Sequence, residues 1–167
     1  FDSSYAPGDK NFDFDVNQIS ITPKRQKVVD FSDPYYTAPQ AVVALNKSKI
    51  ANATTLAELQ GAKLGAQVGT TSLDYINDVV KPAEQPYVYN DTNDAKSALN
   101  SGQIDGIVVD LPTAFYLSAV EVDNGFIAGQ FPLSGSGDNF GLLLAKDSPL
   151  TACVSQAVDA LRADGTL

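Results

Sequence analysis

The sequence places one arginine, Arg25, in a setting that suits the binding of a small carboxylate. It follows the segment 19–23, Ile-Ser-Ile-Thr-Pro, in which hydroxyl side chains end an alternating apolar and polar stretch. A guanidinium pairs with a carboxylate through two parallel hydrogen bonds, a geometry that lysine does not reproduce. A surface arginine on an exposed helical turn is the alternative, because most arginines lie at the surface. Spacing alone leaves both readings open.

Asp110 is the acidic counterpart of this arginine. It ends the apolar segment 104–109 and precedes Leu111-Pro112. A carboxylate at such a strand end can receive an ammonium group, since an unpaired buried charge is costly, and it can equally cap the following helix. Together Arg25 and Asp110 match the two opposite charges of an α-amino acid. Neither residue is specific alone, but the pair predicts a site for a zwitterion.

A third polar group follows the expected strand 63–68. Thr70 and Thr71 come directly after Gly69, where the backbone N–H groups of a new helix attract an anion. Simple N-capping is the alternative. Neither the P-loop nor the dinucleotide glycine pattern is present, which disfavours phosphate. Because ligands bind beyond the carboxyl ends of strands, we expect three ends to converge: Gln18 with Ser20, Gln67 with Thr70 and Thr71, and Asp110.

Hydrophobic periodicity predicts alternating strands and helices, and therefore an α/β fold with largely parallel sheets. The expected strands are 12–19, 40–45, 63–68, 87–89, 104–109 and 140–145. The expected helices cover 55–59 and 91–99, and others begin at Thr22-Pro23, at 69–72, at Pro112 and near Ser148-Pro149.

Composition excludes several classes of function. The net charge of -9 disfavours nucleic acid, and no apolar run is long enough to cross a bilayer. The absence of histidine and the single cysteine disfavour zinc sites and Ser-His-Asp or Cys-His catalysis, so we expect no metal and no cofactor. Cys153 lies in an apolar helical pattern and is predicted to be a small buried hydrophobe. The first residues show no signal peptide, which suggests a mature, truncated or trimmed chain.

Several segments together resemble the type-3 solute-binding proteins, the two-lobed receptors that deliver amino acids to ABC importers. The matching segments are 12–15, 20–25, 29–36, 56–65, 69–72 and 104–110. The string Asp-Phe-Ser-Asp-Pro-Tyr-Tyr at 30–36, with the arginine upstream, is the most specific of them. The resemblance implies a two-lobed periplasmic-binding-protein-like fold of type II. Residues 1–38 would form part of lobe one, 39–136 lobe two, and 137–167 the return to lobe one with a C-terminal helix.

The same resemblance implies a role for each candidate residue. Arg25 would bind the ligand α-carboxylate, assisted by backbone donors at Ser20 and Thr71. Asp110 would take the α-ammonium, together with the Ser20 hydroxyl and the Gln18 carbonyl. The full implied ligand set is Gln18, Ser20, Arg25, Gln67, Thr70, Thr71 and Asp110, with Gln67 and Thr70 along the second-lobe wall. Val109 is apolar where some relatives carry a polar group, which disfavours a strongly charged ligand side chain.

The resemblance also implies partners and a location. We expect capture of an amino acid by lobe closure without chemistry, an ABC permease as the partner, and a periplasmic or membrane-anchored extracellular location without insertion of this segment. Phe31 is expected in the core, and Tyr35 and Tyr36 where the chain crosses between lobes. The glycines at 135 and 137 suit a second crossing. Family members normally begin with a strand and helix that this chain lacks, so lobe one is expected to be incomplete.

Two other functions remain open at this stage. An enzyme on the same fold, such as a cyclohexadienyl or arogenate dehydratase, would need a general acid in the cleft. Apart from Asp110 the sequence offers no clear carboxyl candidate and no histidine. A sensory ligand-binding module would require attached membrane segments.

Overall fold

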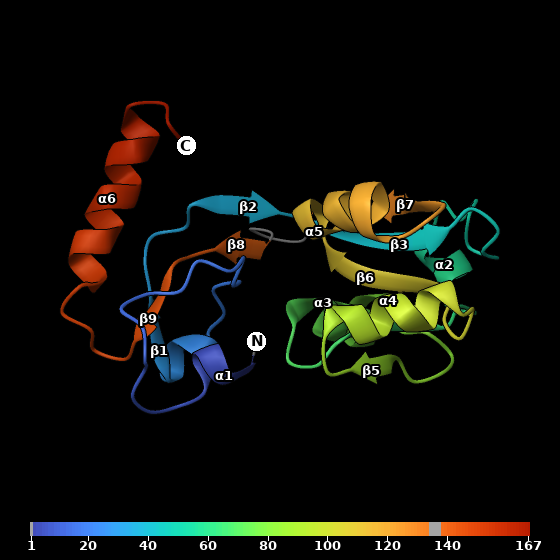
Figure 1. Ribbon diagram of the computed structural model, residues 1–167, viewed down its shortest axis with the longest axis horizontal. Coiled ribbons are helices and arrows are strands. Elements are labelled where there is room, and N and C mark those ends of the chain that lie inside the picture. Colours follow the sequence, from blue (N-terminus) through green and yellow to red (C-terminus); the bar gives the residue numbers. More distant parts are fainter. Residues whose placement is uncertain (1, 134–137) are drawn as a thin grey trace. The chain divides into compact units, whose positions relative to one another are not determined.

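The computed structural model describes residues 2–133 and 138–167, which fall into two compact units (Figure 1). Unit 1 consists of Phe1–Ala38 and Gly135–Leu167, and unit 2 is the continuous stretch Pro39–Ser134. The chain leaves unit 1 after Ala38. The return expected at 136–137 lies outside the described residues, as do the glycines at 135 and 137.

Unit 2 is built on a five-stranded sheet in the order β5-β4-β6-β3-β7. Its strands are β3 (Gln40–Leu45), β4 (Leu64–Gln67), β5 (Tyr87–Tyr89), β6 (Gly106–Asp110) and β7 (Gly125–Gln130). β4 runs parallel to β5 and β6, but β3 runs antiparallel to both β6 and β7. The prediction of largely parallel sheets was therefore wrong. The first residue of β3 pairs with the last of β6, so the chain enters the sheet at the edge where β4 and β6 end.

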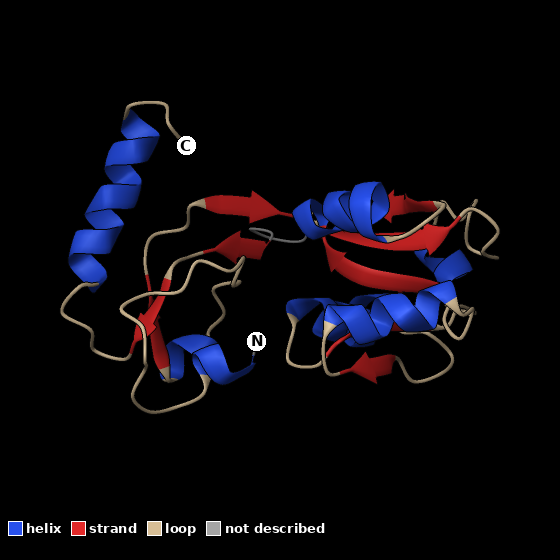
Figure 2. Cartoon of the chain, in the orientation of Figure 1, coloured by secondary structure: helices blue, strands red, loops and turns tan. Residues whose placement is uncertain are grey.

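Helices cover both faces of this sheet (Figure 2). The odd residues of β3, Ala41 and Val43, pack with α4 (Thr92–Asn100) and α5 (Leu111–Tyr116). The even residues, Val42 and Ala44, pack on the other side with α2 (Leu56–Leu59) and the π-helical turn η2 (Ile76–Val80) that continues α3 (Thr71–Tyr75). A second π-helical turn, η3 (Leu117–Glu121), continues α5. Because both faces are buried, β3 reads as a continuous apolar run after its first residue.

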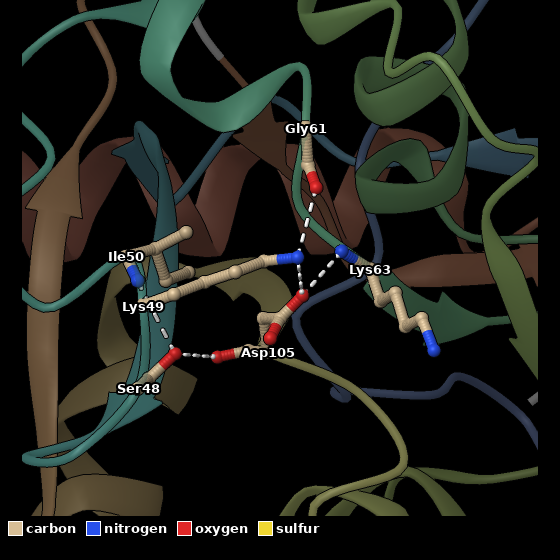
Figure 3. A network of polar contacts seen from close by, with 6 residues as sticks. All are labelled: Ser48, Lys49, Ile50, Gly61, Lys63 and Asp105. Carbon is tan, nitrogen blue, oxygen red and sulfur yellow. Dashed lines mark hydrogen bonds and ion pairs between the residues drawn. The ribbon is translucent and has the colours of Figure 1, made fainter.

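Asp105 connects three segments at the end of the sheet opposite Asp110 (Figure 3). Its Oδ2 accepts the backbone N–H of Lys63 at 2.6 Å and lies 3.0 Å from the Lys49 ammonium. Lys49 also donates to the Gly61 carbonyl, and the Ser48 hydroxyl donates to the Asp105 carbonyl. This network ties the start of β4 to the loop after β3.

Unit 1 has two short antiparallel strand pairs. β1 (Val29–Phe31) pairs with β9 (Leu143–Ala145), and β2 (Tyr36–Ala38) pairs with β8 (Asp138–Phe140). The buried residues Ile19, Val29 and Leu143 form a small core, against which Tyr5, Phe12 and Phe31 pack. The helical elements are α1 (Asp2–Tyr5), the 3-10 turn η1 (Arg25–Lys27) and α6 (Thr151–Ala163). The expectation of Phe31 in the core is confirmed.

Several sequence expectations for unit 1 were wrong. Residues 12–19 do not form a strand, because the segment makes only isolated bridges at Asp15 and just beyond it at Ser20. Two apolar members of its alternating pattern, Phe14 and Val16, are exposed. Thr22-Pro23 begins a turn and then η1 instead of an α-helix, although the Thr22 hydroxyl does accept the backbone N–H of Arg25. The expected strand 140–145 is divided into β8 and β9.

Cys153 is exposed, so the prediction of a buried thiol was also wrong. α6 meets the rest of unit 1 through one face. Thr151 and Ser155 on that face bond to Asp30 and Asp33, and Val158 is buried. Residues 151, 155 and 158 recur at the spacing of one helix face. Cys153 lies outside that face and is therefore exposed. No helix in the described part of the chain is long and apolar enough to cross a membrane.

We predict that Asp105→Ala lowers the free energy of unfolding by about 0.5–1.5 kcal/mol, because it removes the hydrogen bond to the Lys63 N–H and the ion pair with Lys49. Denaturant unfolding measures the change. Asp159→Ala is the matched control, since Asp159 is exposed and pairs with Arg162 across one turn of α6; its cost should stay within about 0.5 kcal/mol. Equal costs for the two variants would show that the Asp105 network does not stabilise the sheet.

Candidate ligand-binding site

Arg25 lies inside unit 1 and not on an exposed turn. Its exposed fraction is 5%, and its Nη1 donates to the Ser20 carbonyl at 2.7 Å. The ring of Tyr5 lies against the guanidinium, with 4.8 Å between Cζ and the ring centroid. Because burying a cation costs free energy unless acceptors surround it, these contacts compensate part of that cost. The reading of Arg25 as a surface arginine is therefore wrong.

The Ser20 carbonyl is directed to Arg25 by the pairing of the chain around it. Ser20 makes an isolated antiparallel bridge with Phe140. The flanking bonds run from Ile21 N to Asn139 O and from Gly141 N to Ile19 O. Ser20 and Phe140 thus form a non-hydrogen-bonded pair of the antiparallel ladder. The N–H and C=O of Ser20 therefore point away from β8.

Gln18 has an unusual backbone conformation in the same segment. Its φ is 50°, in the left-handed region, which costs of order 1–3 kcal/mol for a residue with a side chain. Such conformations concentrate at ligand sites. Gln18 lies close in sequence to Ser20 and Arg25, so one short stretch of unit 1 carries three of the candidate residues.

Asp110 is the last residue of β6 in unit 2 and the N-cap of α5. Its Oδ1 accepts the Thr113 N–H at 2.9 Å, and its Oδ2 accepts the Thr113 hydroxyl at 3.0 Å. The capping alternative is thus what the structure shows. Capping fixes the carboxylate without excluding an ammonium partner, because each carboxylate oxygen has two lone pairs.

Thr70 and Gln67 form a second polar group at the end of β4. The Thr70 hydroxyl accepts the Leu73 N–H at 3.2 Å and donates to the Gln67 carbonyl at 2.8 Å. The Gln67 side chain donates to the Asn90 carbonyl at 3.2 Å and accepts from the Thr92 hydroxyl at 3.3 Å. N-capping by Thr70, one of the two readings of this motif, is confirmed.

Gln40 is a neighbour of the site that sequence reasoning missed. It is the first residue of β3, has an exposed fraction of 4%, and pairs in register with Asp110. Its Nε2 lies 3.5 Å from the Thr71 hydroxyl. It thereby links the end of β6 to the start of α3. The available signal was a polar residue opening an otherwise apolar strand.

The structure brings the candidates together as two groups. In unit 2, Gln67 and Asp110 end strands that run parallel, with Thr70 and Thr71 following β4 at the same sheet edge. Gln18, Ser20 and Arg25 belong to unit 1. The expected convergence of strand ends thus holds for two of the three, because the segment before Ser20 is not a strand. Among the described residues, no group of three or more His, Cys, Asp or Glu side chains is placed to hold a metal.

An open cavity of about 430 Å³ also lies in unit 2, but it is a different place. Its lining is mainly apolar and includes Val42, Leu56, Leu59 and Phe131. None of the seven candidate residues lines it, so it gives no support to the zwitterion site.

One known protein family matches almost the whole chain. The family described as bacterial extracellular solute-binding proteins, family 3, matches residues 6–167. The chain belongs to this family. The match includes all seven candidate residues, and the predicted resemblance is confirmed.

Two curated relatives and one solved structure illustrate the similarity. The Escherichia coli lysine/arginine/ornithine-binding periplasmic protein is 34% identical over 94% of this chain, and the Pseudomonas aeruginosa L-arginine-binding protein is 29% identical over 93%. The chain spans 62% of the length of each relative. An ancestral arginine-binding protein bound to arginine aligns with a TM-score of 0.76 and 30% identity, covering 92% of this chain and 67% of that structure. The type II fold class expected for a solute-binding protein is confirmed.

The Asp110 cap gives a prediction about stability. Asp110→Ala should cost about 0.5–2 kcal/mol, whereas Asp110→Asn should stay within about 0.5 kcal/mol, because asparagine caps a helix as well as aspartate does. Denaturant unfolding of both variants beside the parent chain measures this. If asparagine costs as much as alanine, the negative charge and not the cap is what Asp110 contributes to folding.

Proposed function

We propose that this solute-binding protein captures an amino acid outside the cytoplasm and passes it to an ABC importer. The observation that carries the proposal is the buried guanidinium of Arg25, which donates to the Ser20 carbonyl and lies just upstream of the most specific string of the resemblance, residues 30–36. A buried and oriented guanidinium suits bidentate binding of a carboxylate. Family membership supports the transport role.

In this proposal each of the two charges of the ligand has a binding partner of its own. Arg25 of unit 1 binds the α-carboxylate, with backbone donors of Ser20 and Thr71. Asp110 of unit 2 binds the α-ammonium, with the Ser20 hydroxyl and the Gln18 carbonyl. A ligand stabilises whichever conformation of the chain offers it both contacts, which is the thermodynamic basis of ligand capture.

The proposed substrate class is an α-amino acid, defined by its head group. Relatives of the chain are named as binding proteins for lysine, arginine and ornithine, for L-arginine, and for L-cystine. What these molecules share is the carboxylate and the ammonium on one carbon. Arg25 and Asp110 recognise that shared part, while Gln67 and Thr70 lie along the wall that meets the side chain.

The proposal includes no catalysis. The related proteins named above are binding proteins. The partner is the permease of the importer, and the location is periplasmic or extracellular, with membrane anchoring outside this segment. A thermal-shift screen against the common amino acids, followed by calorimetry on those that raise the melting temperature, tests the function directly. A chain that no amino acid stabilises would contradict the proposal.

We predict that Arg25→Ala weakens binding of the selected amino acid by about 2–5 kcal/mol, as expected when one partner of a buried charge pair is removed. Calorimetry measures the change. Arg162→Ala is the matched control, because Arg162 is an exposed arginine of the same unit whose contacts, with Asp159 and the Pro34 carbonyl, involve none of the candidate residues. An unchanged affinity in Arg25→Ala, with the control behaving as the parent, would remove Arg25 from the site.

Asp110→Asn should weaken binding of the same amino acid at least tenfold while keeping the helix cap. The control is Asp91→Asn, which alters the equivalent cap of α4 in the same unit. A ligand analogue with hydroxyl in place of the ammonium identifies the contact. Asp110→Asn should lose far less affinity for that analogue than for the amino acid, and equal losses would show that Asp110 does not meet the ammonium.

A further inference from the structure

Tyr5 is a residue of unit 1 that the family comparison gives no role. Its ring lies over the Arg25 guanidinium, with the Cζ atom 4.8 Å from the ring centroid. A cation within about 6 Å of an aromatic face is attracted by the ring quadrupole, and the attraction grows when the pair is removed from water. Arg25 is buried, so this contact operates where it is strongest.

The ring and the Ser20 carbonyl use different parts of the guanidinium. The N–H donors of arginine lie in the guanidinium plane, and the Ser20 carbonyl accepts one of them from Nη1. The contact with Tyr5 is made over the face of the tyrosine ring. A carboxylate approaches in the guanidinium plane, because bidentate pairing requires two parallel N–H bonds. A cation–π contact does not itself require those in-plane donors, so it is compatible with carboxylate binding by the same arginine.

Tyr5 is itself held in place by the structure around it. It ends α1, and the preceding Ser4 hydroxyl donates to Asp15 Oδ2 at 2.8 Å. Asp15 exchanges two backbone hydrogen bonds with Leu143. The Tyr5 ring packs against the core cluster that contains Leu143. The segment around Tyr5 is thus anchored at the same strand, β9, that builds the core of unit 1.

We infer that Tyr5 is a positioning residue for Arg25: its ring fixes the plane of the guanidinium before a ligand carboxylate arrives. This inference rests on the proposed function of Arg25. A guanidinium that is already oriented loses less rotational freedom when it binds, so pre-orientation strengthens binding without adding a contact to the ligand. The alternative is that Tyr5 only fills the core of unit 1.

Three variants separate these roles. Tyr5→Leu removes the ring but leaves an apolar side chain, and Tyr5→Phe keeps the ring. Phe12→Leu is the matched control, because Phe12 packs on the same core cluster as Tyr5. Calorimetry should show about three- to tenfold weaker amino-acid binding for Tyr5→Leu. Tyr5→Phe and Phe12→Leu should stay within about twofold of the parent chain.

A measurement without ligand tests the orientation itself. The ring of Tyr5 should shift the NMR resonance of the Arg25 Nε–H in the ligand-free chain. That resonance should move in Tyr5→Leu and stay close to its parent position in Tyr5→Phe and Phe12→Leu. An unchanged resonance in Tyr5→Leu overturns the inference, as does an equal loss of affinity in Phe12→Leu. A parent chain that binds no amino acid overturns the proposed function, and the ligand-free spectra still decide whether Tyr5 orients Arg25.

Discussion

The proposed site depends first on the burial of one cation. Arg25 is removed from water and placed where the Ser20 carbonyl accepts one of its N–H donors and its Cζ lies 4.8 Å from the centroid of the Tyr5 ring. A guanidinium in that position has lost hydration, and it gains from any anion that completes its surroundings. Its orientation in turn depends on the bridge between Ser20 and Phe140, which directs the serine carbonyl away from β8. Local pairing in unit 1 therefore orients the carbonyl that accepts the Arg25 N–H, on which the proposed carboxylate contact depends.

In unit 2 the helix caps place polar groups where the proposal needs them. Asp110 and Thr70 each satisfy backbone donors at the start of a helix, as any short polar residue can. Because both caps follow strands that end at the same edge of the sheet, they also gather polar groups in one place. Gln40, buried beside them, joins the two caps through Thr71 and its register with Asp110. The groups proposed to meet the ligand are thus groups that the fold already needs.

The features that the sequence predicted well have local signals. The cap at Thr70, the helices expected at 55–59 and 91–99, and the apolar runs of β3 and β6 involve neighbours along the chain, and they lie where the residues suggested. The direction of β3 was missed because an apolar run carries no information on which strand it will pair with. β1 and β2 have three residues each, too few for a period to show. The contact of Tyr5 with Arg25 could not be predicted, because no helical or strand period relates the two positions.

Unit 2 is one uninterrupted stretch of chain, whereas unit 1 is assembled from segments on either side of it. The Ser32 hydroxyl, for example, accepts the N–H of Leu142, 110 residues further along. Closing so long a loop is entropically costly while the intervening chain is random, and much less so once that chain has collapsed into a compact body. We expect the inserted stretch to condense first and to bring the ends of unit 1 near each other. The bridge between Ser20 and Phe140, which directs the Ser20 carbonyl to Arg25, can form only after ribosomal synthesis has passed residue 140.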